Sequence, residues 1–102
     1  MMPDKATNGM TPAHYAALHG HGAALEVLKE LGASITEKNI DCATPAHCAA
    51  ENGHVAALQV LKESGVSMID KASNGMIPAH FAALHGHVAA LHVLKDSGAS
   101  KT

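Results

Sequence analysis

The sequence predicts an all-α repeat solenoid of three stacked helix-turn-helix units. Its main signal is a heptapeptide that occurs three times at intervals of 33 residues, as TPAHYAA (11–17), TPAHCAA (44–50) and IPAHFAA (77–83). A fixed period of this length is typical of repeat proteins. The second signal is composition: 47% of the residues are apolar, but there is one Tyr, one Phe and no Trp. A core made mainly of Ala, Leu and Val suits closely packed helices better than a sandwich or a barrel.

The period makes the chain a single domain, 1–102, whose three units span residues 4–36, 37–69 and 70–102. Each unit opens with a turn signal: Asn8-Gly9, Asp41-Cys42 and Asn74-Gly75. Asn-Gly pairs favour tight turns because both residues tolerate positive φ. Cys42 is the exception, since a non-glycine residue at positive φ costs about 1 kcal/mol. We expect Cys42 either to adopt that strained conformation or to open the second turn into another shape.

Two short helices are predicted after each turn. A proline begins the first helix, where its missing N–H costs nothing, and Thr11 or Thr44 precedes it as N-cap, whereas Ile77 lacks the hydroxyl. The first helices cover about 12–19, 45–52 and 78–85, and the second helices about 22–31, 55–64 and 88–97. A glycine follows each helix, the residue that favours the left-handed conformation past a helix end. Helices this short are unstable alone, so stability must come from stacking the units.

The joint pattern Gly-x-Thr-Pro-x-His-x-Ala-Ala-x-x-Gly-His, followed by Val-Leu-Lys and Gly-Ala, resembles the ankyrin repeat. The resemblance covers essentially the whole chain, three times. It implies an antiparallel helix pair in each repeat, β-hairpin-like turns at right angles to the helices, and a slightly curved stack. One departure is Ala13, Ala46 and Ala79, where the family usually has Leu. We expect larger neighbours to fill that space or the helices to sit closer together.

The resemblance also implies a function, which is non-catalytic protein–protein interaction on the concave side, through turn tips and inner helices. The partner-facing positions are those that the repeat pattern leaves free: Thr7, Asn8, Met10, Leu18, His19, Ile40, Asp41, Ala43, Glu51, Asn52, Ser73, Asn74, Met76, Leu84 and His85. Their methionines and leucines form an apolar stripe that Glu51 interrupts. The alternative is that these are solvated loop residues that no partner uses, and that the chain is a structural spacer or a fragment of a larger multidomain protein.

Nine histidines raise the question of a metal site. Six of them recur in every unit, and by resemblance they are scaffold residues that hydrogen-bond hydroxyls and backbone groups: His14, His47, His80, His21, His54 and His87. His19, His85 and His92 do not recur in all three units, and a metal-responsive binder built from them is a third, less favoured function. Structural zinc needs four ligands. Helices pack 8–10 Å apart, so the first and third units lie about 20 Å apart and cannot share an ion. We therefore predict no metal and no cofactor.

The sequence also lacks the marks of an enzyme. Cys48 follows His47 directly, but adjacent residues on a helix point about 100° apart, so the two are not poised for nucleophilic catalysis. Cys48 instead occupies the register of Tyr15 and Phe81, an inner-helix packing position. A Walker loop, a His-Glu-x-x-His motif and a Gly-x-Ser-x-Gly motif are all missing. We predict a protein without catalytic activity.

Charge and hydropathy restrict the partners and the compartment. A formal net charge of −2 gives no electrostatic basis for binding nucleic acid. No run of apolar residues is long enough to span a membrane, and the N-terminus does not resemble a secretory signal. Two cysteines without a disulfide framework favour the cytoplasm. We expect a monomer, with self-association through the uncapped first unit as the alternative.

Overall fold

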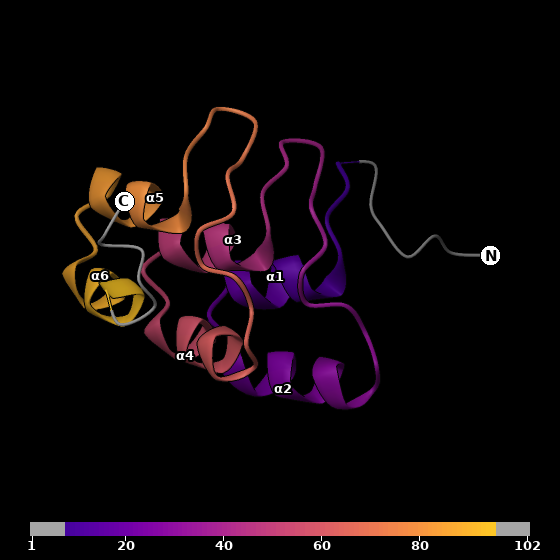
Figure 1. Ribbon diagram of the computed structural model, residues 1–102. Helices are drawn as coiled ribbons and strands as arrows, with labels where there is room; N and C mark the ends of the chain where they lie inside the picture. Colours follow the sequence, from indigo (N-terminus) through magenta and orange to yellow (C-terminus); the bar gives the residue numbers. More distant parts are fainter. Residues whose placement is uncertain (1–7, 96–102) are drawn as a thin grey trace.

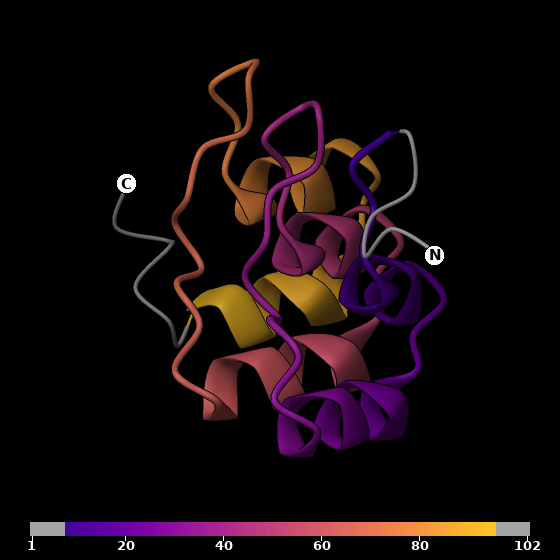
Figure 2. The ribbon, with the colours of Figure 1, turned by 90° about the vertical axis from the view of Figure 1, so that its right-hand side faces the viewer.

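In the computed structural model, which describes residues 8–95, the predicted helices are confirmed. They are α1 (Pro12–Leu18), α2 (Gly22–Glu30), α3 (Pro45–Glu51), α4 (Val55–Glu63), α5 (Pro78–Leu84) and α6 (Val88–Lys95). The inner helices α1, α3 and α5 form one row and the outer helices α2, α4 and α6 form a second row (Figure 1). The loops before α3 and α5 project beyond the inner row on the same side, as Figures 1 and 2 show.

Each inner helix begins with a cap that the repeated histidine completes. The backbone N–H of the N-cap residue donates to the imidazole Nδ1 three residues later, and the N···N distances are 3.1, 3.1 and 2.9 Å in the three units. In the first unit the Thr11 hydroxyl also accepts from the backbone N–H of His14, as predicted for an N-cap. The Thr44 hydroxyl bonds instead to the imidazole of His47, at 3.0 Å. Ile77 lacks a hydroxyl, yet the imidazole bond at its backbone N–H remains.

The second turn keeps the shape of the third turn, so the first of the two alternatives for Cys42 is confirmed. Cys42 has φ of 60°, and Gly75 at the matching position has φ of 82°. Both donate to the carbonyl three residues earlier, at 2.9 Å. The Asn39 side chain stabilises the strained turn, because its Oδ1 accepts from the backbone N–H groups of Asp41 (2.8 Å) and Ala43 (3.0 Å). The third turn has Ala72 in place of Asn39, and there the Asn74 side chain accepts only one of the equivalent groups, the Met76 N–H, at 3.0 Å.

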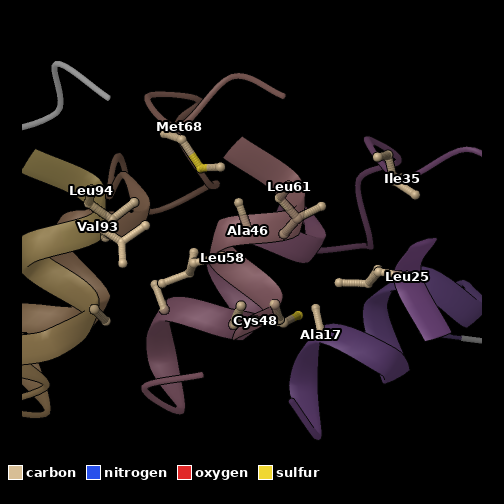
Figure 3. Close-up of a cluster of buried hydrophobic side chains, with 14 of the residues drawn as sticks. Ala17, Leu25, Ile35, Ala46, Cys48, Leu58, Leu61, Met68, Val93 and Leu94 are labelled. Atoms are coloured by element: carbon tan, nitrogen blue, oxygen red, sulfur yellow. The ribbon is translucent and has the colours of Figure 1, made fainter. Parts of the chain in front are cut away.

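A continuous core runs along the stack between the two rows of helices (Figure 3). Its largest members are four fully buried leucines, namely Leu25, Leu58, Leu61 and Leu94. Burying each leucine contributes roughly 1.5–3 kcal/mol relative to leaving it exposed. Ala13 and Ala46 are also buried, at 1% and 0% exposure. The core thus binds each unit to the next, and it leaves the turns and the inner helices to form a surface.

Candidate functional site

The turns and the inner helices line a hollow of about 320 Å³ that is open to solvent on one side. The second and third turns supply most of its turn residues, Met10 comes from the first turn, and helices α1, α3 and α5 all contribute to its lining. The lining residues are Met10, Leu18, Asn39, Asp41, Ala43, His47, Cys48, Glu51, Ala72, Ser73, Asn74 and Phe81. The hollow is therefore a product of stacking, since no single unit supplies all of its lining.

Backbone hydrogen bonds hold the turn tips in a row. The N–H of Ile40 donates to the carbonyl of Asn8 at 3.1 Å, and the N–H of Ser73 donates to the carbonyl of Asp41 at 2.8 Å. Each turn is thus fixed to the one before it at the same register. Such links make the tips a connected edge rather than three independent loops.

His47 lines the hollow, and its hydrogen bonds are those of a neutral ring. Its Nδ1 accepts from the Thr44 backbone N–H, so the ring proton is on Nε2, which donates to the Met76 carbonyl at 3.0 Å. Burial lowers the pKa of His47, although the Met76 carbonyl and the Asp70 carboxylate favour the charged form. The Phe81 ring meets the imidazole edge to face, with 5.4 Å between centroids. This histidine joins the second unit to the third, as the scaffold interpretation predicts.

Cys48 is a packing residue rather than a nucleophile. It is 6% exposed, and burial raises the pKa of its thiol to about 11, with a further contribution from the Glu51 carboxylate. A thiol with such a pKa is protonated at neutral pH, and only the thiolate reacts as a nucleophile. At the same register, however, Tyr15 is 42% exposed and Phe81 is partly exposed. The small Cys48 leaves the space that the hollow occupies, and Phe81 borders it.

The charged groups of the hollow are carboxylates, and no Lys or Arg lines it. In the outer turns the side chains of Asn8 and Asn74 accept the backbone N–H two residues later, at 3.0 Å. In the middle turn Asn39 accepts the equivalent N–H, so the Asp41 carboxylate makes no hydrogen bond within residues 8–95. The Glu51 carboxylate is half exposed and lies 3.9 Å from the His85 imidazole. Asp41 and Glu51 give the hollow an acidic surface.

The structure brings seven of the predicted partner-facing residues to the hollow: Met10, Leu18, Asp41, Ala43, Glu51, Ser73 and Asn74. Seven others lie at the turns or helix ends outside its lining: Asn8, His19, Ile40, Asn52, Met76, Leu84 and His85. Thr7 lies outside the described residues. Met10 is largely buried, at 8% exposure, whereas Ile40 and Leu84 are each 68% exposed.

Sequence reasoning missed five lining residues: Asn39, His47, Cys48, Ala72 and Phe81. His47, Cys48 and Phe81 were assigned to the scaffold because they belong to the repeated heptapeptide. The available signal for the hollow was side-chain size at one register of the repeat, which Tyr15, Cys48 and Phe81 occupy. A small residue between two aromatic residues leaves a gap. Asn39 has no equivalent in the third turn, where Ala72 replaces it. That difference was a signal that the second turn has side-chain contacts of its own.

The remaining histidines form pairs and contacts between units. The rings of His19 and His21 lie 6.2 Å apart, and those of His85 and His87 lie 6.0 Å apart. Among residues 8–95 no three His, Cys, Asp or Glu side chains come together as metal ligands. His87 Nε2 donates to the Glu51 carbonyl at 2.9 Å, which ties the third unit to the second. The same part of the chain contains no helix of the length and apolarity needed to cross a membrane.

Comparison with known proteins agrees with this architecture. The family described as "Ankyrin repeats (many copies)" matches residues 23–61 and 46–94, and "Ankyrin repeat" matches residues 8–37. The ankyrin repeat domain of human ASB11 superimposes with a TM-score of 0.82 at 30% identity, over 87% of this chain and 40% of that one. A probable E3 ubiquitin-protein ligase of rice (Oryza sativa subsp. japonica), XBOS32, is 46% identical over 41 residues.

Both relatives are longer than the part that matches. The rice protein is matched over 40% of this chain but only 8% of its own length. Those matches therefore concern the repeats alone. The family matches together span residues 8–94, and the fold agrees with them. The chain belongs to the ankyrin repeat family.

Proposed function

We propose that this chain, as one domain over residues 1–102, is a non-catalytic module that binds a partner protein through the hollow. The observation that carries the proposal is the joint lining of the hollow by all three turns and all three inner helices. Ankyrin repeats are general protein-interaction modules, and concave sites with apolar walls and a few polar groups are the usual ligand sites of proteins. The turns are hydrogen-bonded to one another, so this surface is formed before a partner arrives.

The lining favours a partner segment with a basic side chain beside an apolar one. Met10, Leu18 and Phe81 offer apolar contacts, and Asp41 and Glu51 offer carboxylates with no Lys or Arg nearby in the lining. Exposed ion pairs contribute roughly 0.2–1 kcal/mol each. Fully burying a Leu or Phe side chain contributes roughly 1.5–3 kcal/mol. The apolar anchors therefore set most of the affinity, and the carboxylates set the preference for a basic residue.

Selection from a displayed peptide library tests this proposal. We expect the chain to enrich peptides with Lys or Arg next to an apolar residue. Phe81→Ala and Leu18→Ala should each weaken binding of a selected peptide by about tenfold, since 1.4 kcal/mol corresponds to a factor of ten. Glu51→Gln should weaken it less. Val27→Ala is the matched control, because Val27 is 52% exposed on α2 and does not line the hollow.

The same experiment separates the module from a structural spacer. A spacer would enrich no peptide, or would enrich peptides that the hollow variants bind as well as the original chain does. We further propose a cytoplasmic setting, because both cysteines are free thiols and structural disulfides are rare in the cytoplasm.

A further inference from the structure

The hollow lies where a small side chain replaces an aromatic one. Tyr15 and Phe81 occupy the same register of the first and third inner helices, and Cys48 occupies it in the second. Cys48 and Phe81 both line the hollow, and Tyr15 does not. An aromatic ring at position 48 would project into the space that the thiol leaves. We call this space, bordered by Cys48 and Phe81, the Cys48 gap.

The size of the hollow limits what it can hold. Its volume of about 320 Å³ is near the lower end of the range of roughly 300–1,000 Å³ for ligand sites in proteins. It therefore suits one or two side chains of an extended segment rather than a whole helix. The Ser73 N–H donates to the Asp41 carbonyl at 2.8 Å, which joins the second and third turns beside this space. Met10 and Leu18 supply apolar lining.

Two carboxylates from different elements border the hollow. Glu51 comes three residues after Cys48 on α3, so the two side chains share one face of that helix. Asp41 comes from the turn before α3, and its carboxylate makes no hydrogen bond within residues 8–95. The His85 imidazole, 3.9 Å from the Glu51 carboxylate, does not line the hollow. A positively charged side chain in the hollow would thus meet two carboxylates and no Lys or Arg of the lining.

The Phe81 ring adds an aromatic surface to the same space. Phe81 is partly exposed, and its ring packs edge to face with the His47 imidazole at 5.4 Å between centroids. His47 is fixed in turn by its bond to the Met76 carbonyl at 3.0 Å. Aromatic faces attract cations, and arginine is the more frequent partner. The hollow therefore combines the aromatic and anionic groups that favour a cation.

We propose that the Cys48 gap takes one arginine side chain of the partner protein. This inference rests on the proposed function and narrows its basic residue to arginine. A guanidinium is planar and weakly hydrated, so it can stack on the Phe81 ring while its N–H groups donate to Asp41 and Glu51. A lysine ammonium is a compact, strongly hydrated charge that lacks this flat surface. The apolar stem of the arginine would lie against the lining that Leu18 provides.

Displayed libraries that differ at one fixed position test this assignment. The central residue of otherwise random peptides is Arg in one library, Lys in a second and Gln in a third. Selection on the 102-residue chain at pH 7.5 should enrich the Arg library most. In a selected peptide, replacing that Arg by Lys should weaken binding about fivefold, the factor expected for one exposed cation–π contact. Replacing it by Gln should weaken binding further, because the charge is lost.

Variants of the chain locate the arginine. Cys48→Phe fills the gap with the side chain that the third unit carries at this register, and it should weaken the Arg peptide about tenfold or more. Cys48→Ala leaves the gap open and is the matched control, with affinity within about twofold of the original. Phe81→Leu keeps an apolar wall and removes the ring, so Arg and Lys peptides should bind it equally. Circular dichroism checks that each variant folds.

A double variant keeps the test decisive if Cys48→Phe does not fold. Asp41→Asn with Glu51→Gln preserves side-chain shape and removes both charges, so most of the difference between Arg and Gln peptides should disappear. Equal binding of Arg and Lys peptides by the original chain overturns the arginine assignment and leaves the interaction module intact. Full affinity of Cys48→Phe for the Arg peptide also overturns it. Enrichment from none of the three libraries overturns the proposed function itself.

Discussion

The middle and third units have nearly the same sequence motif in different surroundings. His47 is 2% exposed and Leu58 is fully buried, whereas His80 is exposed and Leu91 is only partly buried. The middle unit has a neighbour on both sides, and among residues 8–95 the third unit has one on a single side. Helices of seven to nine residues have little stability of their own. The difference shows that neighbours, rather than the motif, determine what each residue contributes.

The largest expected difference between the two units is at the core leucines. Leu58→Ala should lower the free energy of unfolding by about 2–5 kcal/mol, because it removes a fully buried side chain and leaves a cavity. Leu91→Ala should cost less than half as much, since Leu91 keeps part of its contact with water. Urea denaturation followed by far-ultraviolet circular dichroism measures both. Equal losses would mean that stacking does not set the contribution of these leucines.

The glycines after the inner helices give a matched pair with a smaller effect. Gly53 and Gly86 have φ of 70° and 71°, so alanine at either position carries the same conformational cost of about 1–2 kcal/mol. Only at Gly53 would the added Cβ meet a histidine ring, that of His87, at 2.7 Å. Gly53→Ala should therefore destabilise the chain by about 1 kcal/mol more than Gly86→Ala.

A double variant identifies the cause of that excess. Adding His87→Ala to Gly53→Ala removes the ring that the new methyl group meets. The interaction energy from the double-mutant cycle should then recover the excess. If the two glycine variants have equal stability, the ring moves aside at no cost. Glycine would then be needed at position 53 only because the backbone there has a positive φ.

Titration of His47 should produce a still smaller, pH-dependent effect. Burial lowers the pKa of His47 in the folded chain below the 6.5 of an ordinary histidine. The unfolded chain therefore binds more protons as the pH falls. The stability that the neutral ring provides is present above pH about 6.5 and is lost as the pH falls below it. Asp70 opposes the shift and Lys38 adds to it.

His47→Gln isolates this contribution from the other histidines. Gln at the third helical position can still accept the N-cap N–H, as in a capping box, but it does not titrate. Between neutral pH and pH about 5, stability should fall more steeply for the original chain than for the variant. Parallel pH profiles would show that His47 has the same pKa in the folded and unfolded states.

The backbone was largely predictable from sequence, whereas the lining of the hollow was not. Proline at 12, 45 and 78 and glycine after each helix act through local conformation, so the pattern located every helix to within a few residues. The Phe81 ring borders the hollow because Cys48, one unit earlier, is small. That relation joins two units and depends on side-chain size. Asn39 likewise bonds to the backbone N–H groups of Asp41 and Ala43 in a turn whose closed shape the sequence left open as one of two alternatives.

The smallest expected effect is at the turns, where Cys42 and Gly75 occupy the same position. Cys42→Gly removes a left-handed penalty of about 1–2 kcal/mol, but the glycine adds roughly 0.5–1 kcal/mol of backbone entropy to the unfolded chain. The net gain in stability should be a few tenths to about 1 kcal/mol. Gly75→Cys should lower stability by a similar amount, and thermal or urea denaturation resolves both changes.

The reverse exchange also tests what allows cysteine in the second turn. Asn39 holds two backbone N–H groups of that turn, those of Asp41 and Ala43. In the third turn Asn74 holds the Met76 N–H, the counterpart of the second group, and Ala72 cannot hold the counterpart of the first. Adding Ala72→Asn to Gly75→Cys should therefore recover part of the lost stability. If Ala72→Asn changes the stability of the original chain and of the Gly75→Cys variant equally, the amide does not offset the strain. The middle turn would then tolerate Cys42 only because it is flanked by turns on both sides, and the neighbours rather than Asn39 would account for the difference.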